Sequence, residues 1–276
     1  MTLDLLGFGI SQVLTFLLVL IRVAGIFTAA PIFGNVNVTP WVRVAIAVCL
    51  AFVFLPMAHP PFPPLLRGGE GGVFLNGGEG GGLPAFIVMI VKEALVGLVM
   101  GFLVAMMFAA IQMAGAFIDL QVGFGFANIV DPMMKQHNAV IGQLYNLAAT
   151  LLFLALNGHH LMIRGLADSF AVLPLGGMVV TPGATAGMVQ VFAVLFVAAL
   201  KIGAPVVGAI FLTDVSLGIL ARTVPQLNVF VVGFPAKLTV GLLAVFAVLP
   251  ITFVVMRGLF GGLERDLVRL LRCIGG

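Results

Sequence analysis

Residues 84–117 read PAFIVMIVKEALVGLVMGFLVAMMFAAIQMAGAF, and this stretch decides the fold class. Its only charged side chains are Lys92 and Glu93. A helix that crosses a bilayer needs about 20 largely apolar residues. The stretch is longer than that, which predicts a helix that tilts, kinks or continues beyond the bilayer into a protein assembly.

The composition of the whole chain agrees with this stretch. Of 276 residues, 62% are hydrophobic and 8% are charged, whereas about a quarter are charged in a typical soluble domain. The excess apolar sequence must face lipid or other hydrophobic subunits. We therefore predict an all-α integral membrane helix bundle with long kinked helical hairpins. Its six hydrophobic segments are 5–29, 42–57, 84–117, 139–172, 187–213 and 229–256.

The same pattern predicts the domain organisation. Residues 1–256 form one membrane-embedded domain, interrupted by a loop rich in Gly and Pro at 56–83. Residues 257–276 form an amphipathic tail helix near the membrane surface, with a basic face. Its arginines favour a cytoplasmic C-terminus, and six crossings would place the N-terminus on the same side. These arginines are Arg257, Arg265, Arg269 and Arg272.

Small residues recur every fourth position in the third segment. Gly97, Gly101, Ala105 and Ala109 are expected on one helix face, where another backbone can approach closely. The Lys92-Glu93 pair beside them has two interpretations: a proton relay, or burial against carbonyls or a partner subunit.

Polar residues in the fourth segment share a narrow arc of the predicted helix. Gln143, Asn146, Thr150 and Asn157 fall together at about 100° per residue. The arc indicates hydrogen bonding between helices or the lining of an aqueous conduit. Other polar positions are interpreted as buried or inter-subunit contacts, several of them at helix ends. The full set is Arg22, Lys92, Glu93, Gln143, Asn146, Asn157, Lys201, Asp214, Arg222, Gln226, Asn228 and Lys237.

The segment between the third and fourth hydrophobic stretches reads QVGFGFANIVDP at 121–132. Its glycines permit unusual dihedrals beside bulky aromatic side chains. Such a segment can plug a pore by steric block and dewetting, or it can be an ordinary packed loop. The gating candidates are Gln121, Gly123, Phe124, Gly125, Phe126, Asn128, Asp131 and Pro132.

Patterns of catalytic chemistry are missing from the sequence. It has no HExxH, GxSxG or Walker A motif. We therefore expect no enzyme activity, no metal and no cofactor.

Several blocks, in order along the chain, resemble the FliR family of type III export-gate proteins. They are RVAGIF (22–27), APIFG (30–34), KEALVG (92–97), QVGFGFANIVDP (121–132), NGHH (157–160) and PQLNVFVVGFP (225–235). The resemblance covers roughly residues 20–250, and the Gly-rich stretch 67–82 departs from the family pattern.

The resemblance implies an export-gate subunit in the bacterial inner membrane, at the flagellar basal body. Such a subunit forms a closed pore with FliP and FliQ, with FlhB and FlhA as further partners and no nucleic acid. Unfolded flagellar proteins pass through the pore, and residues 121–132 act as its plug. Two alternatives remain: the matching subunit of an injectisome, and a secondary transporter of small solutes, whose signature is broken helices around an intramembrane site.

Overall fold

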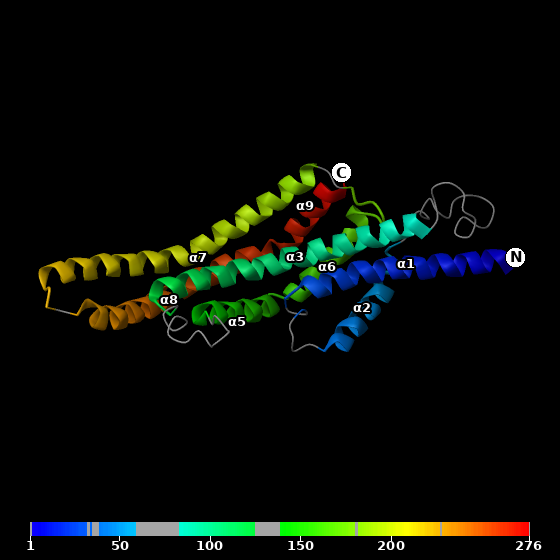
Figure 1. The fold of residues 1–276 in the computed structure, drawn as a ribbon. Helices are drawn as coiled ribbons and strands as arrows, with labels where there is room; N and C mark the ends of the chain where they lie inside the picture. Colours follow the sequence, from blue (N-terminus) through cyan, green and yellow to red (C-terminus); the bar gives the residue numbers. More distant parts are fainter. Residues whose placement is uncertain are drawn as a thin grey trace. The chain divides into compact units, whose positions relative to one another are not determined.

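The computed structural model describes residues 2–31, 34, 39–58, 83–124, 139–179, 182–226 and 228–275. All regular secondary structure within these ranges is helical (Figure 1). The helices are α1 (Thr2–Ala29), α2 (Pro40–Phe54), α3 (Leu83–Val122), α5 (Val140–Ala155), α6 (Gly158–Val172), α7 (Pro182–Thr223), α8 (Val229–Gly261) and α9 (Leu263–Gly275). The predicted helical membrane bundle is confirmed. The predicted loop at 56–83 lies outside the described residues except at its ends.

The predicted fourth segment is two helices rather than one. α5 ends at Ala155 and α6 begins at Gly158, and Asn157 between them has a φ of 55°. Asn is among the few residues other than Gly that adopt this left-handed conformation readily. The predicted fourth segment, 139–172, therefore has a break at this point, and the two helices are bent by 66° relative to each other.

By length and composition, four helices in the described part of the chain can cross a membrane. They are α1, α3, α7 and α8, and the count becomes five if α5 and α6 form one broken span. α2 has 15 residues, which is shorter than a span requires. The described residues therefore contain fewer candidate spans than the six crossings predicted. The cytoplasmic location of both termini stays a prediction.

The chain divides into two compact units. The first comprises Met1–Ala105, His159–Gln190 and Leu263–Gly276, and the second comprises Met106–Gly158 and Val191–Gly262. α3 and α7 each contribute to both units. The single membrane-embedded domain stays a prediction.

Close backbone contact joins α1 to α3 in the first unit. A Cβ atom built on Gly25 would lie 2.9 Å from the Cα of Gly97, and one built on Gly97 would collide with the carbonyl oxygen of Arg22. Glycine has no Cβ atom and so leaves room for this approach. Small residues allow the same close packing between other membrane helices. On α2, the ring of Phe54 packs against Phe170 of α6 with centroids 6.0 Å apart.

α9 is the amphipathic helix predicted for the tail, and it is shorter than the predicted range. It begins at Leu263, so Arg257 belongs to α8. Its apolar face packs on its own unit, where Leu267 lies against Gly165 of α6 and the carbonyl of Ile274 accepts a bond from the Val179 amide. Leu263, Leu267, Leu270, Leu271 and Ile274 are buried, whereas Arg265, Arg269 and Arg272 are exposed.

Asp266 is a half-buried acidic residue of α9. Burial raises the pKa of its carboxyl above the ordinary value, and the charges of Arg269 and Arg265 partly offset this effect. Ionised Asp266 therefore costs the folded state some stability at neutral pH.

Three aromatic rings from three helices meet in the core of the second unit. Phe108 of α3 lies 5.6 Å from Phe153 of α5 and 5.3 Å from Phe260 of α8, measured between ring centroids. The third pair, Phe153 and Phe260, is an edge-on contact at 5.2 Å. Aromatic pairs of this kind stabilise a core by more than the burial of their apolar surface alone accounts for.

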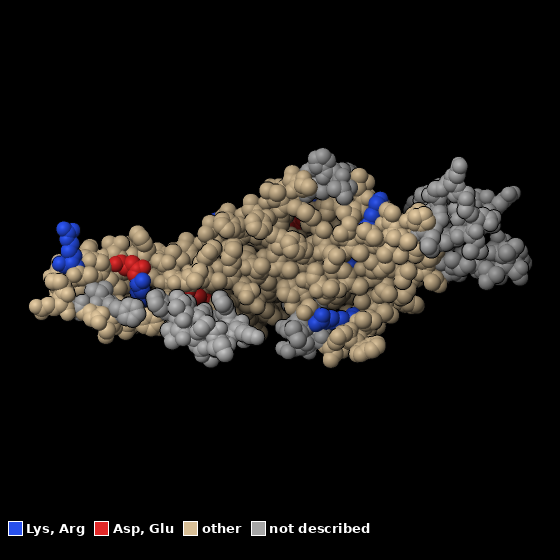
Figure 2. Space-filling view, viewed as in Figure 1, with Lys and Arg blue, Asp and Glu red and all other residues tan. Residues whose placement is uncertain are grey.

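Much of the helical surface is apolar. The face drawn in Figure 2 carries few charged side chains. Within the chain, only 22% of an 18-residue apolar window of α8 is buried. Lipid or other proteins must cover the remainder.

Candidate functional site

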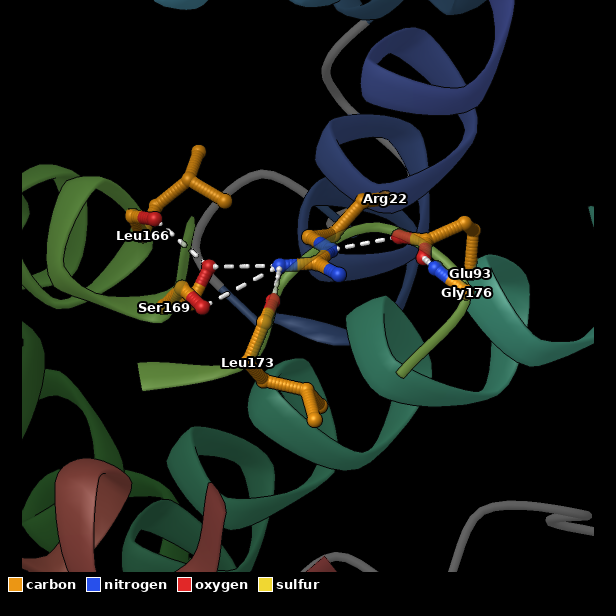
Figure 3. A network of polar contacts seen from close by, with 6 residues as sticks. All are labelled: Arg22, Glu93, Leu166, Ser169, Leu173 and Gly176. Atoms are coloured by element: carbon orange, nitrogen blue, oxygen red, sulfur yellow. Dashed lines mark hydrogen bonds and ion pairs between the residues drawn. The ribbon is translucent and has the colours of Figure 1, made fainter. Parts of the chain in front are cut away.

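A buried ion pair links α1 to α3 in the first unit (Figure 3). The Nε atom of Arg22 lies 2.6 Å from Oε2 of Glu93. The two side chains are 0% and 1% exposed. At this burial each charge is tolerable only because the other compensates it.

The guanidinium of Arg22 also binds the C-terminal end of α6. Its Nη1 donates to the carbonyl oxygens of Ser169 (3.2 Å) and Leu173 (3.0 Å), and to the hydroxyl of Ser169 at 3.3 Å. The guanidinium carbon also lies 4.7 Å from the centroid of the Phe170 ring. The Ser169 carbonyl also accepts a bond from the Leu173 amide. Arg22 adds a second donor there and a donor for the Leu173 carbonyl, and so caps the C-terminal end of α6. Its Nη2 is buried and has no hydrogen-bond partner in the described structure.

Glu93 and Lys92 hold the turn that follows α6. Oε1 of Glu93 accepts a bond from the Gly176 amide at 2.8 Å, and the Lys92 ammonium donates to the Gly176 carbonyl at 3.4 Å. Gly176 has a φ of 76°, which favours glycine at this position. One carboxylate and two cations therefore fix α1, α3, α6 and this turn together. The geometry is that of a structural clamp. Of the predicted Lys92-Glu93 pair, Lys92 bonds to a carbonyl, whereas Glu93 bonds to Arg22 and to an amide.

The sequence interpretation missed a second buried carboxylate, in the second unit. Asp119 lies near the end of α3 and is 4% exposed. Its Oδ1 accepts a bond from the Ile141 amide and its Oδ2 from the Gly142 amide, both at 3.0 Å. These amides belong to the first turn of α5, whose own N-cap residue, Ala139, makes no side-chain cap. A lone acidic residue at the end of a long apolar segment was the available signal.

The candidate plug residues are described only in part. Gln121 is the penultimate residue of α3, and Gly123 and Phe124 form a turn directly after the helix. All three are half-buried. The other candidates, Gly125, Phe126, Asn128, Asp131 and Pro132, lie outside the described residues.

The small residues predicted to form one packing face of α3 do so at its first two positions, and not at its last. Gly97 and Gly101 pack on α1, where a Cβ built on Gly101 would lie 2.7 Å from the Ile26 carbonyl. Ala105 is half-buried, and Ala109 is exposed. Gly101 already lies beside Ala29, the last residue of α1, so the contact with α1 does not extend to Ala109.

The polar arc of the fourth segment is also corrected. Asn157 lies in the break after α5 and is exposed, so it does not share a helix face with the other three. Thr150 and Asn146 are half-buried, and the Thr150 hydroxyl donates to the Asn146 carbonyl at 2.9 Å. Gln143 is exposed.

The polar candidates near the ends of α7 and α8 include a pair within the chain. The Lys237 ammonium lies 2.5 Å from Oδ1 of Asp214, and the side chains are 31% and 32% exposed. Lys201 is exposed on α7, which continues through Pro205. The other members of the predicted set, Arg222, Gln226 and Asn228, are exposed. Contacts between subunits at these positions stay predictions.

Metal ligation finds no support in the described residues, which contain no group of three or more His, Cys, Asp or Glu side chains able to hold an ion.

Comparison with known proteins gives the family. The family model described as "Bacterial export proteins, family 1" matches residues 13–263. The chain belongs to this family. Flagellar biosynthetic protein FliR of Bacillus subtilis (strain 168) is 36% identical over 263 residues, which cover 94% of this chain and 95% of the relative.

Two further relatives carry the same name. FliR of Escherichia coli (strain K12) is 31% identical, with 84% of this chain and 83% of the relative covered. FliR of Pectobacterium carotovorum subsp. carotovorum is 30% identical, with 84% and 82% covered. As a member of this export family with such relatives, the chain is a membrane-embedded component of the flagellar export apparatus.

Proposed function

We propose that this chain is a subunit of the flagellar protein-export gate. It forms a closed pore with FliP and FliQ in the bacterial inner membrane, at the flagellar basal body. Unfolded flagellar proteins pass through this pore, and FlhB and FlhA contact the gate. The chain has no catalytic role in this proposal.

The observation that carries the proposal is the amount of helix surface left uncovered. At about 1.5 Å per residue, the 31-residue apolar stretch of α8 is about 46 Å long. The hydrocarbon core of a bilayer is only about 30 Å thick. Since only 22% of an 18-residue window of this stretch is buried within the chain, most of its surface needs a cover that is longer than the hydrocarbon core. Partner subunits of similar apolar character supply the missing cover.

The cluster around Arg22 supports the same function in a different way. Its charges are compensated within one unit and capped by backbone carbonyls. A transporter needs a polar site that a solute or ion can enter. A closed clamp suits a rigid building block of an assembly better.

The test is co-expression of the tagged chain with FliP and FliQ of the same genome, followed by purification in mild detergent. We expect one stable complex that contains all three proteins. Gly97→Leu provides the negative control, because a large side chain there must separate α1 from α3. A chain that purifies alone, monodisperse and folded, would contradict the proposal and support the solute transporter. Assembly only with injectisome subunits would support that alternative.

A further inference from the structure

Asp119 bonds to the chain on both sides of the connection between α3 and α5. Its carboxylate accepts bonds from the Ile141 and Gly142 amides at the start of α5. Its backbone carbonyl accepts bonds from the Gly123 and Phe124 amides at the end of α3, both at 3.1 Å. Gly123 has a φ of 100°, typical of the glycine that ends a helix. One residue therefore satisfies both ends of the connection.

Packing around these bonds leaves the two ends little freedom. A Cβ built on Gly115 would lie 2.5 Å from the Cα of Gly142, so the backbones of α3 and α5 are in direct contact. On α8, Gly241 admits the Val122 side chain, which would lie 2.6 Å from an added Cβ. The end of α3 is thus held between α5 and α8.

Capping alone does not explain a carboxylate at this position. A helix is ordinarily capped by the side chain of the residue just before it, and Ala139 holds that place in α5. An Asp, Asn or Ser there would cap the helix without burying a carboxylate in an apolar core, which is costly. What Asp119 adds is a bond between two helices.

We propose that Asp119 is a positioning residue, which ties the start of α5 to the end of α3 and so holds the pore-gating residue Phe124 in place. The gating role of Phe124 rests on the proposed function. The tie between the two helices does not.

The tie is tested by the distance between the helices in the purified full-length chain in mild detergent, alone or in complex with FliP and FliQ. Cys49 and Cys273 are replaced, and nitroxide labels are attached to cysteines at Leu120 and Leu144, which are 70% and 51% exposed. We expect a narrow distance distribution in the parent and a broad one in Asp119→Ala. Asp214→Ala, which removes a carboxylate from the same unit, should stay narrow. A narrow distribution in Asp119→Ala would overturn the proposal.

A second variant separates tying from capping and protects the test against poor folding. Asp119→Ala combined with Ala139→Asp supplies α5 with a local cap but no bond to α3. We expect it to assemble and still show the broad distribution. A return to the narrow distribution would mean that Asp119 only caps α5, and the proposal would fall.

Leakage of a small dye from vesicles that contain the complex links the tie to gating. We expect leakage from the double variant and from Phe124→Ala, and none from Asp214→Ala. If Phe124→Ala leaks and the double variant does not, although its distance distribution is broad, the link between Asp119 and Phe124 would be overturned. If Phe124→Ala does not leak, the gating role fails, and the distance distributions still decide the tie.

Discussion

Glu93→Gln tests the buried clamp most directly. The substitution keeps the size of the side chain and an oxygen that can accept the Gly176 amide. It removes the negative charge 2.6 Å from Arg22, whose side chain is fully buried. Removal of one partner from a buried ion pair leaves an uncompensated charge and costs about 3–5 kcal/mol. For a protein of this size, each kcal/mol lowers the melting temperature by about 2–4 °C, so a decrease of about 6–20 °C is expected.

The assay is heating of the fluorescently tagged complex in detergent, followed by size-exclusion chromatography. The melting temperature is the point at which half of the tagged chain has left the monodisperse peak. Asp214→Asn is the matched control, because it also converts a carboxylate to an amide in an ion pair. That pair is about one-third exposed, so its loss should cost at most about 1 kcal/mol.

A double variant makes the reasoning stricter. Arg22→Met combined with Glu93→Gln leaves no buried charge in the pair, so it should recover part of the lost stability. Recovery should be incomplete, because the carbonyls of Ser169 and Leu173 lose the Arg22 donor, and Ser169 keeps only the bond from the Leu173 amide. Equal and small decreases for Glu93→Gln and Asp214→Asn would refute the clamp.

Three further predictions follow from other parts of the structure. Gly97→Ala should lower the free energy of unfolding by about 1–3 kcal/mol, because the added methyl group overpacks the contact with α1. Gly208→Ala should not lower it, because an added Cβ there meets nothing within 4 Å. Equal melting temperatures for the two variants would contradict the close contact. Phe124→Ala with Phe126→Ala should leave assembly intact and let small solutes leak through vesicles that contain the complex, and normal assembly with unchanged permeability would reject the plug. Because burial raises the pKa of Asp266, its folded state binds a proton more readily than its unfolded state, so stability falls as pH rises through the window above the ordinary pKa. Wild type should therefore gain stability relative to Asp266→Asn as pH is lowered through that window in denaturant titrations, and a pH-independent difference would contradict this.

Sequence patterns predicted those features that depend on near neighbours along the chain. The apolar segments were found because a helix must present apolar residues over its whole length to enter a membrane. The amphipathic α9 was found because its leucines recur at helical spacing. The close approach at Gly97 and Gly101 was found because small residues recur on one face.

The sequence by itself therefore determined a helical membrane protein, its family and most of its helices. Only the tertiary structure decided that Arg22 pairs with Glu93, 71 residues away, that Asp119 caps α5, and that α9 packs on its own unit. The physical reason is that helix periodicity repeats every few residues, whereas the partner of a buried charge depends on which distant helices pack together. Local spacing shows that a buried charge needs a partner, and only the packed helices determine which residue it is.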